Sequence, residues 1–290
     1  MSEARTLQAV GSDGTVGVVT VAEGLPADAL TWVFVPAMGV RAAWYRPLSR
    51  ALAARGVRLA VVEWRGHGES PVRPCRGVNW GYRELVEVDL VAAVRAVQAA
   101  FPMAPRVLGG HSLGGQLTAL LLAAQPELAE ALVTVAACSV WWRAFPGATS
   151  ARVLAGTQAA SALAAGLGWF PGPRVGFAGH EARGVVADWA AQARTGRYRV
   201  RGTEVDYHAG LAVASRPALL LSLVGDERLA PRSAVAHLAG LLPSGSTEHV
   251  YVDHPRVRAL RRPHVEWAAE PGPVLDVALR WLHRHASIAL

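Results

Sequence analysis

The chain has 290 residues, of which 52% are hydrophobic and 18% are charged. This length and composition exclude a disordered or collagen-like chain and suffice to bury a large core without disulfide or metal staples. The formal net charge is +7, and every one of the 29 basic residues is an arginine. Because the arginines are scattered rather than concentrated on one element with interleaved aromatic residues, we expect no nucleic-acid partner.

The N-terminal half shows a hairpin followed by alternating strands and helices. Two β-branched runs at 7–10 and 16–22 flank a glycine-containing turn, which predicts an antiparallel hairpin. From residue 31 onward, short apolar runs alternate with longer helical patterns, which is typical of a parallel, mostly buried sheet. Strands are predicted at 31–35, 58–64, 106–109, 131–136, 217–224 and 247–252. Helices are predicted at 42–55, 83–101, 114–124, 231–242 and 274–283.

The alternation stops after Cys138 and resumes at residue 217. Residues 139–210 carry four of the ten tryptophans, several glycines and no clear strand pattern. An insertion between two strands of a parallel sheet lies over the carboxyl edge of that sheet, where ligands bind. We therefore predict a core formed by residues 1–138 and 211–290 and a cap formed by residues 139–210. An irregular surface excursion is the alternative.

The strongest chemical signal is the sequence Gly-His-Ser-Leu-Gly-Gly at 110–115, where Ser112 follows a predicted strand and precedes a predicted helix. A serine on such a tight turn adopts a strained backbone geometry, and only small neighbours let the strand and helix pass close to it. The turn raises the hydroxyl above the sheet edge and aims the amides of the helix N-terminus at a developing oxyanion. The pattern predicts that Ser112 is a nucleophile.

A serine hydroxyl needs a base to accept its proton and an acid to orient that base. In this topology the chain order is serine, acid, histidine. We expect His264 to be the base because it stands between the last strand and the last helix, with His254 as the alternative. The acid should follow the strand at 217–224, where Asp226 and Glu227 are adjacent, and either carboxylate could orient the imidazole.

Together these residues resemble the α/β-hydrolase superfamily over nearly the whole chain. The elbow at 110–115 is similar to the family's nucleophile turn, and Glu-Trp-Arg-Gly-His-Gly-Glu-Ser at 63–70 resembles its loop after the fourth strand, D-x-R-G-x-G-x-S. Residues 264–271 resemble the family's tail, a histidine followed by a Glu-Pro that opens the last helix. The PAMGV segment from Pro36 and the elbow together look like the monoglyceride-lipase and serine-aminopeptidase-like branch of bacterial hydrolases.

The resemblance implies an α/β-hydrolase fold, a mostly parallel sheet flanked by helices with an N-terminal antiparallel hairpin and an inserted cap. It also implies an oxyanion hole formed by the amides of Met38 and Leu113. Two features depart from the family: Pro36-Ala37 replaces the usual His-Gly before the first donor, and the family spacing reaches Asp226 from one side but Glu227 from the other. Because aspartate is the commoner acid in this family, the resemblance favours Asp226.

The expected function is a serine hydrolase that cleaves a carboxylic ester or thioester through an acyl-enzyme on Ser112, with a small-molecule acyl substrate. An acyltransferase with the same triad and a non-catalytic binding protein of this fold are the alternatives. No HExxH, no His/Cys cluster and no phosphate-binding glycine loop occurs, so we expect neither a metal nor another cofactor.

Cysteine content and the N-terminal segment favour a cytoplasmic protein. The two cysteines, Cys75 and Cys138, exclude a disulfide scaffold and are expected to be free thiols. The first fourteen residues carry charges and lack the apolar core of a signal peptide. Residues 154–173 are rich in Ala, Gly, Ser and Thr, which argues against a spanning helix and against stable membrane insertion. The oligomeric state is left open.

Overall fold

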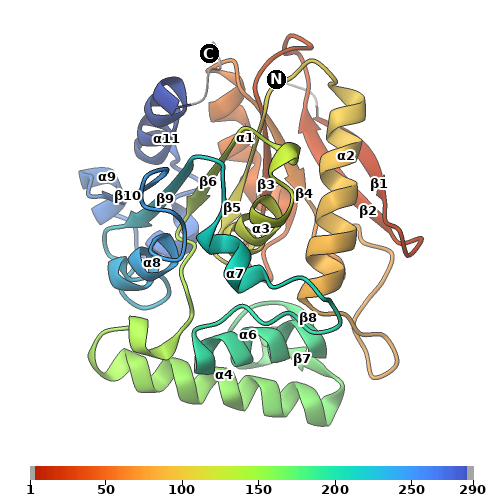
Figure 1. Ribbon diagram of the computed structural model, residues 1–290, viewed down its shortest axis with the longest axis vertical. Coiled ribbons are helices and arrows are strands. Elements are labelled where there is room, and N and C mark those ends of the chain that lie inside the picture. The colour runs from red at the N-terminus through yellow and green to blue at the C-terminus, as the bar shows by residue number, and fades with distance from the viewer. Residues whose placement is uncertain (1–3, 286–290) are drawn as a thin grey trace.

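The computed structural model describes residues 4–285, and these build an eight-stranded sheet in the order β1-β2-β4-β3-β5-β6-β9-β10 (Figure 1). The strands are β1 (Ala4–Val10), β2 (Val16–Ala22), β3 (Thr31–Val35), β4 (Arg58–Val62), β5 (Arg106–His111), β6 (Ala131–Val135), β9 (Ala218–Leu223) and β10 (Thr247–Val252). β1 pairs antiparallel with β2 and β2 with β4, whereas the pairs from β4 to β10 are parallel. The predicted hairpin and parallel sheet are confirmed.

Helices cover both faces of the sheet, so every residue of the central strands β3, β4, β6 and β9 is buried. This double burial explains why these strands are continuous apolar runs in the sequence. The flanking helices are α1 (Arg46–Ala53), α2 (Val91–Ala100), α3 (Leu113–Ala124), α8 (Arg232–Ala239) and α11 (Gly272–His285). Shorter helical segments are η1 (Ala42–Tyr45), η2 (Glu84–Leu90), η3 (Pro126–Leu128), α9 (Pro255–Arg258) and α10 (Pro263–Glu266).

Two predicted helices begin differently from the expectation. The helix predicted at 42–55 starts with the 3₁₀ segment η1 before α1, and Pro47 in the first turn of α1 is compatible with that entry because its missing N–H is not needed there. The helix predicted at 83–101 opens with the seven-residue π-helical segment η2 before α2.

The insertion between β6 and β9 is mostly helical. Its elements are η4 (Trp142–Ala144), α4 (Gly147–Leu167), β7 (Trp169–Pro171), α5 (Gly172–Val175), β8 (His180–Ala182) and α6 (Arg183–Thr195). α4 packs against α6 at one end of the sheet, seen at the bottom of Figure 1, and β7 pairs antiparallel with β8. The expectation of no strand here was therefore wrong, because three-residue strands are too short to produce an alternating pattern.

The helix α7 (Tyr207–Ala212) links the insertion back to the sheet, and it packs against α3. It spans residue 210, where the sequence placed the boundary of the cap. Most buried hydrophobic residues form one continuous cluster over the sheet and its helices. A second small cluster inside the insertion consists of Ala164, Phe170 and Val186.

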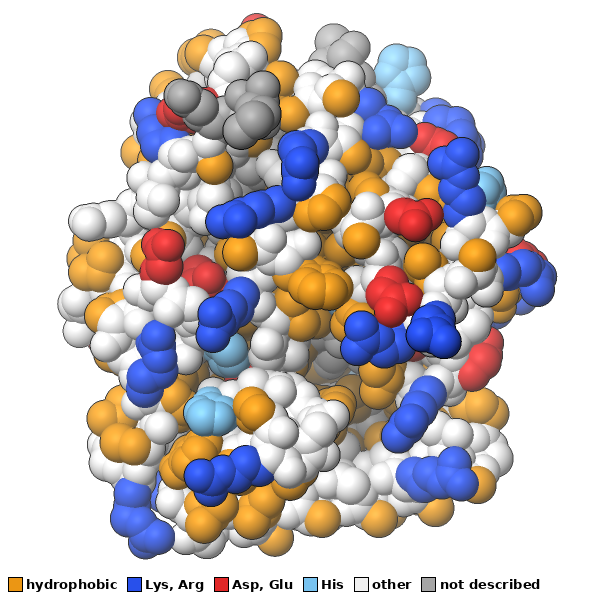
Figure 2. Space-filling model, turned by 180° about the vertical axis from the view of Figure 1, so that it is seen from behind, with side chains coloured by type: hydrophobic (Ala, Val, Ile, Leu, Met, Phe, Trp, Pro, Cys, Tyr) orange, Lys and Arg blue, Asp and Glu red, His pale blue; other side chains and the backbone are white. Residues whose placement is uncertain are grey.

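The surface shows no single charged stripe on the face drawn in Figure 2, where arginine side chains are spread among acidic and hydrophobic ones. Among the helices of residues 4–285, none is both long enough and apolar enough to cross a membrane.

Candidate active site

Ser112 stands on the turn between β5 and α3 with φ 55° and ψ −122°, a conformation that L-residues rarely adopt. Glycines make this turn possible. A Cβ on Gly114 would overlap the carbonyl oxygens of Val35 and Pro36, and a Cβ on Gly110 would lie 2.5 Å from the Val35 oxygen. The close approach of α3 to the end of β3 therefore requires glycine on both sides of the serine, as the sequence pattern indicated.

The structure brings Ser112, His264 and Asp226 together. His264 Nε2 lies 3.1 Å from Ser112 Oγ, and His264 Nδ1 lies 2.6 Å from Asp226 Oδ2. Asp226 follows β9 and is 3% exposed, whereas His264 lies on α10 and is 8% exposed. A serine, an imidazole and a buried carboxylate connected in this order can move a proton away from the hydroxyl and stabilise the resulting cation.

The two alternatives from the sequence lie outside this chain of hydrogen bonds. Glu227 is exposed on the surface, although it neighbours Asp226 in the sequence. His254 is the N-cap of α9, and its Nδ1 accepts a hydrogen bond of 3.1 Å from the Arg256 N–H. His254 therefore has a local structural contact of its own.

Met38 and Leu113, whose amides the sequence predicts to be oxyanion donors, line the same pocket. Leu113 is the first residue of α3, so its N–H belongs to the unpaired amides at the positive end of a helix dipole. Met38 follows β3 on the loop that Gly114 touches. Within residues 4–285, neither of these two N–H groups donates a hydrogen bond to another residue.

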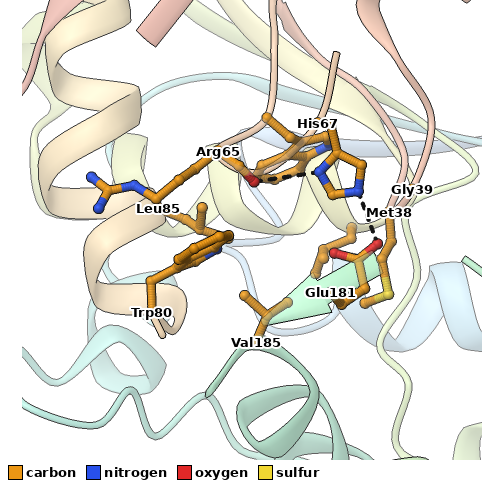
Figure 3. A pocket seen from close by; sticks show the side chains of 10 residues that line it. Met38, Gly39, Arg65, His67, Trp80, Leu85, Glu181 and Val185 are labelled. Carbon is orange, nitrogen blue, oxygen red and sulfur yellow. Dashed lines mark hydrogen bonds and ion pairs between the residues drawn. The ribbon is translucent and has the colours of Figure 1, made fainter. Parts of the chain in front are cut away.

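A narrow pocket adjoins these amides and separates the sheet edge from the insertion (Figure 3). Its apolar wall comes from Met38, Leu113, Trp80, Leu85 and Val185. The cavity volume is about 10 Å³, which is the room for about one water molecule.

The polar wall of the pocket is an ion pair that sequence reasoning missed. His67, in the loop after β4, lies with its Nε2 3.2 Å from Glu181 Oε1 of β8, and the side chains are only 9% and 6% exposed. Burial disfavours the charged imidazole, but Glu181, the Arg65 carbonyl and the Glu63 carboxylate together outweigh it, so the pKa of His67 is raised. The pair therefore joins the insertion to the core beside the Met38 loop, as Figure 3 shows.

His111, inside the elbow, is fully buried and lies with its ring centroid 4.8 Å from that of His264. Burial and the neighbouring His264 hold the pKa of His111 well below its usual value, so its imidazole is neutral. Among residues 4–285 there is no group of three His, Cys, Asp or Glu side chains that could hold a metal ion.

A mostly parallel sheet with a strained serine turn after its fifth strand has the architecture of an α/β-hydrolase. A family model described as serine aminopeptidase, S33 matches residues 29–169. None of the curated proteins matches the sequence.

Solved structures match nearly the whole chain. A thermophilic esterase from Thermogutta terrifontis is 16% identical, with 98% of this chain and 100% of that chain covered and a TM-score of 0.64. An esterase from Rhodococcus sp. ECU1013 is 21% identical, with 99% and 100% covered and a TM-score of 0.57. The esterase domain of a Rhodothermus marinus protein is 16% identical, with 98% and 99% covered and a TM-score of 0.59. At these identities the likeness is one of fold. The family model and these structures show that the chain has the α/β-hydrolase fold.

Proposed function

We propose that the protein is a serine hydrolase that cleaves a carboxylic ester or thioester through an acyl-enzyme on Ser112. The observation that carries this proposal is the continuous chain of hydrogen bonds from Ser112 Oγ through His264 to Asp226. The fold relatives named as esterases support the same class of reaction.

In the first half of the reaction, Ser112 Oγ attacks the substrate carbonyl carbon while His264 Nε2 accepts the hydroxyl proton. Asp226 accepts a hydrogen bond from Nδ1–H and stabilises the imidazolium. The tetrahedral intermediate collapses, the bond to the alcohol or thiol breaks, and His264 gives its proton to that leaving group. In the second half, water loses a proton to His264 and attacks the acyl carbon. The bond between that carbon and Ser112 Oγ then breaks, and His264 gives its proton to Oγ, which releases the carboxylic acid and restores the Ser112 hydroxyl.

The N–H groups of Met38 and Leu113 stabilise the negative oxygen of both tetrahedral intermediates. Neither group is committed to another hydrogen bond within the described chain, which leaves both available for this role. A single donor of this kind contributes about 10²- to 10³-fold in rate.

The insertion serves as a cap over the acyl-binding pocket. It supplies Glu181 and Val185 to the pocket that Met38 and Leu113 line from the core. Because the cavity is narrow, we propose that the cap moves when an acyl group enters. The apolar wall favours an apolar acyl group, and the unpaired thiols of Cys75 and Cys138 fit a cytoplasmic enzyme.

The proposal is tested by labelling the purified protein with a fluorophosphonate and locating the modified residue by mass spectrometry. We expect a single label on Ser112, none in Ser112→Ala, and hydrolysis of p-nitrophenyl esters that falls by at least about 10⁴-fold in the same variant. Adding a graded series of alcohols then measures the ratio of acyl transfer to hydrolysis. Absence of labelling at Ser112 would support a non-catalytic binding protein instead.

A further inference from the structure

The loop that carries Met38 is held by two buried aromatic side chains. Trp64 Nε1 donates to the carbonyl oxygens of Pro36 and Ala37 at 3.1 and 3.2 Å. The Tyr45 hydroxyl accepts a hydrogen bond of 3.0 Å from the Ala37 N–H. Trp64 is 5% exposed and Tyr45 is fully buried, so these hydrogen bonds form away from solvent.

The contact of Trp64 fixes the direction of the proposed oxyanion donor. The Ala37 carbonyl and the Met38 N–H belong to one peptide group, which is planar and trans, so the two bonds point in opposite directions. Two donors, Trp64 Nε1 and the Val40 N–H at 3.0 Å, hold the Ala37 oxygen. Holding that oxygen therefore also holds the Met38 N–H on the other side of the same plane.

Tyr45 connects this loop to the serine turn. Its oxygen lies 2.9 Å from Nδ1 of His111, the residue directly before Ser112. Because the oxygen already accepts the Ala37 N–H, the hydroxyl proton is the one available for Nδ1, and burial raises the pKa of Tyr45 so that this proton is retained. The phenol thus links the Ala37 N–H, one residue before Met38, to the side chain of His111, two residues before Leu113.

We propose that Tyr45 and Trp64 are positioning residues for the oxyanion hole. They fix the geometry of the loop that carries Met38, in which Pro36-Ala37 replaces the usual His-Gly. The inference rests on the proposed function, because it assigns the two side chains to the Met38 and Leu113 donors. It goes beyond that function by naming the side chains that set the geometry of the loop.

The test compares Tyr45→Phe and Trp64→Phe with two matched controls. Tyr207→Phe removes another buried phenol hydroxyl, on α7, which donates to Glu87 of η2 at 3.0 Å. Trp281→Phe removes another buried indole, on α11. All four variants keep an aromatic ring in the core, so a loss common to all of them reports stability rather than positioning.

In the positioning variants we expect kcat to fall by about 10- to 100-fold with KM changed by less than about threefold. The affinity for a trifluoromethyl ketone, whose oxyanion would occupy the hole after addition of Ser112, should fall in parallel with kcat/KM. The controls should keep the wild-type kcat and inhibitor affinity. An unchanged inhibitor affinity in both positioning variants would overturn the proposal even if their melting temperatures fall.

Hydrogen exchange provides a readout that needs no activity. Exchange of the Ala37 amide in Tyr45→Phe should accelerate by about tenfold, because the Ala37 N–H loses its acceptor. In Trp64→Phe the Val40 N–H keeps the Ala37 oxygen as its acceptor, but that oxygen loses its second donor, so the looser loop should also accelerate exchange of the Val40 amide. Unchanged exchange at both amides overturns the proposal. If the wild-type protein is not labelled at Ser112, the proposed function fails, and the exchange rates still decide whether these side chains hold the loop.

Discussion

The sheet edge and the insertion meet at the candidate site, but they are held in different ways. On the sheet edge, Ser112 directly follows β5 and Asp226 follows the short turn after β9, so main-chain pairing of these strands sets their positions. The insertion reaches the same place through side-chain contacts such as Glu181 to His67 and Tyr198 to Gln116, the latter at 2.9 Å. Functional side chains that are held by the strands of a sheet are positioned more accurately than side chains that are held by contacts between loops.

Because of this difference, the chemical step and the entry of substrate depend on different regions of the molecule. The hydrogen bonds among Ser112, His264 and Asp226 all lie within the core, whereas the pocket is closed by residues from both regions. Changes on the sheet edge should therefore reduce the rate of acyl transfer to Ser112. Changes at the contacts of the insertion should act on substrate entry and on the stability of the closed form.

The largest effect is expected from Asp226→Asn. The amide can donate to Nδ1 of His264 and so favours the wrong tautomer, with Nε2 as the protonated nitrogen that cannot accept the proton of Ser112. We expect kcat for ester hydrolysis to fall by about 10⁴-fold. Glu227→Gln is the matched control because Glu227 is exposed, and its kcat should stay within about twofold of wild type. The reverse ranking of the two variants would assign the acid to Glu227.

The next largest effect is expected where the Met38 loop touches the insertion. Gly39 has φ +76°, and a Cβ there would overlap the backbone of Gly179 and Ala178. Gly39→Ala should lower kcat/KM by about 10- to 100-fold because the loop or the insertion must shift. Gly14→Ala provides the control, since Gly14 has φ +78° and open space around it.

Both glycine variants share the cost of a left-handed alanine, about 1 kcal/mol in the free energy of unfolding. Steady-state kinetics and urea unfolding, measured on both variants, distinguish the backbone strain that they share from the overlap with the insertion that occurs only in Gly39→Ala. Equal kcat/KM in Gly39→Ala and Gly14→Ala would show that the contact between the loop and the insertion does not affect the reaction.

The same difference explains what could be predicted from the sequence. The strands, the serine turn and the position of His264 depend on local patterns, so each could be assigned from neighbouring residues. The choice between Asp226 and Glu227 depends on the turn after β9, where Gly225 at φ +82° aims the first of the two side chains into the core. That geometry is not encoded in the spacing of the motif.

The contacts that sequence reasoning missed join residues far apart in the chain. Glu181 is 114 positions from His67, and His111 is 66 positions from Tyr45. Periodicity reports which face of an element is buried but not which distant loop meets it. The short strands of the insertion were missed for a related reason, because three residues cannot show a period of two.

The smallest effect concerns the pH dependence of the contact between His67 and Glu181. The pKa of His67 is raised in the folded protein, because Glu181 on β8, the carbonyl of Arg65 and the carboxylate of Glu63 together outweigh its burial. A raised folded pKa adds stability that is complete below the unfolded pKa, about 6.5, and is lost as the pH rises through the folded pKa. The insertion should therefore loosen from the core as the pH rises above about 6.5.

Glu181→Gln tests this dependence because it removes the charge that His67 faces and keeps the shape of the side chain. The free energy of unfolding, measured in urea from about pH 6 to pH 9, should fall with pH more steeply in the wild type than in the variant. Glu248→Gln is the control: Glu248 lies 3.0 Å from His285, but both side chains are more than a third exposed, so solvent screens the pair. Its pH profile should follow that of the wild type. Parallel profiles for Glu181→Gln and the wild type would mean that the buried pair does not fasten the insertion, and that its packing against the Met38 loop holds the pocket closed.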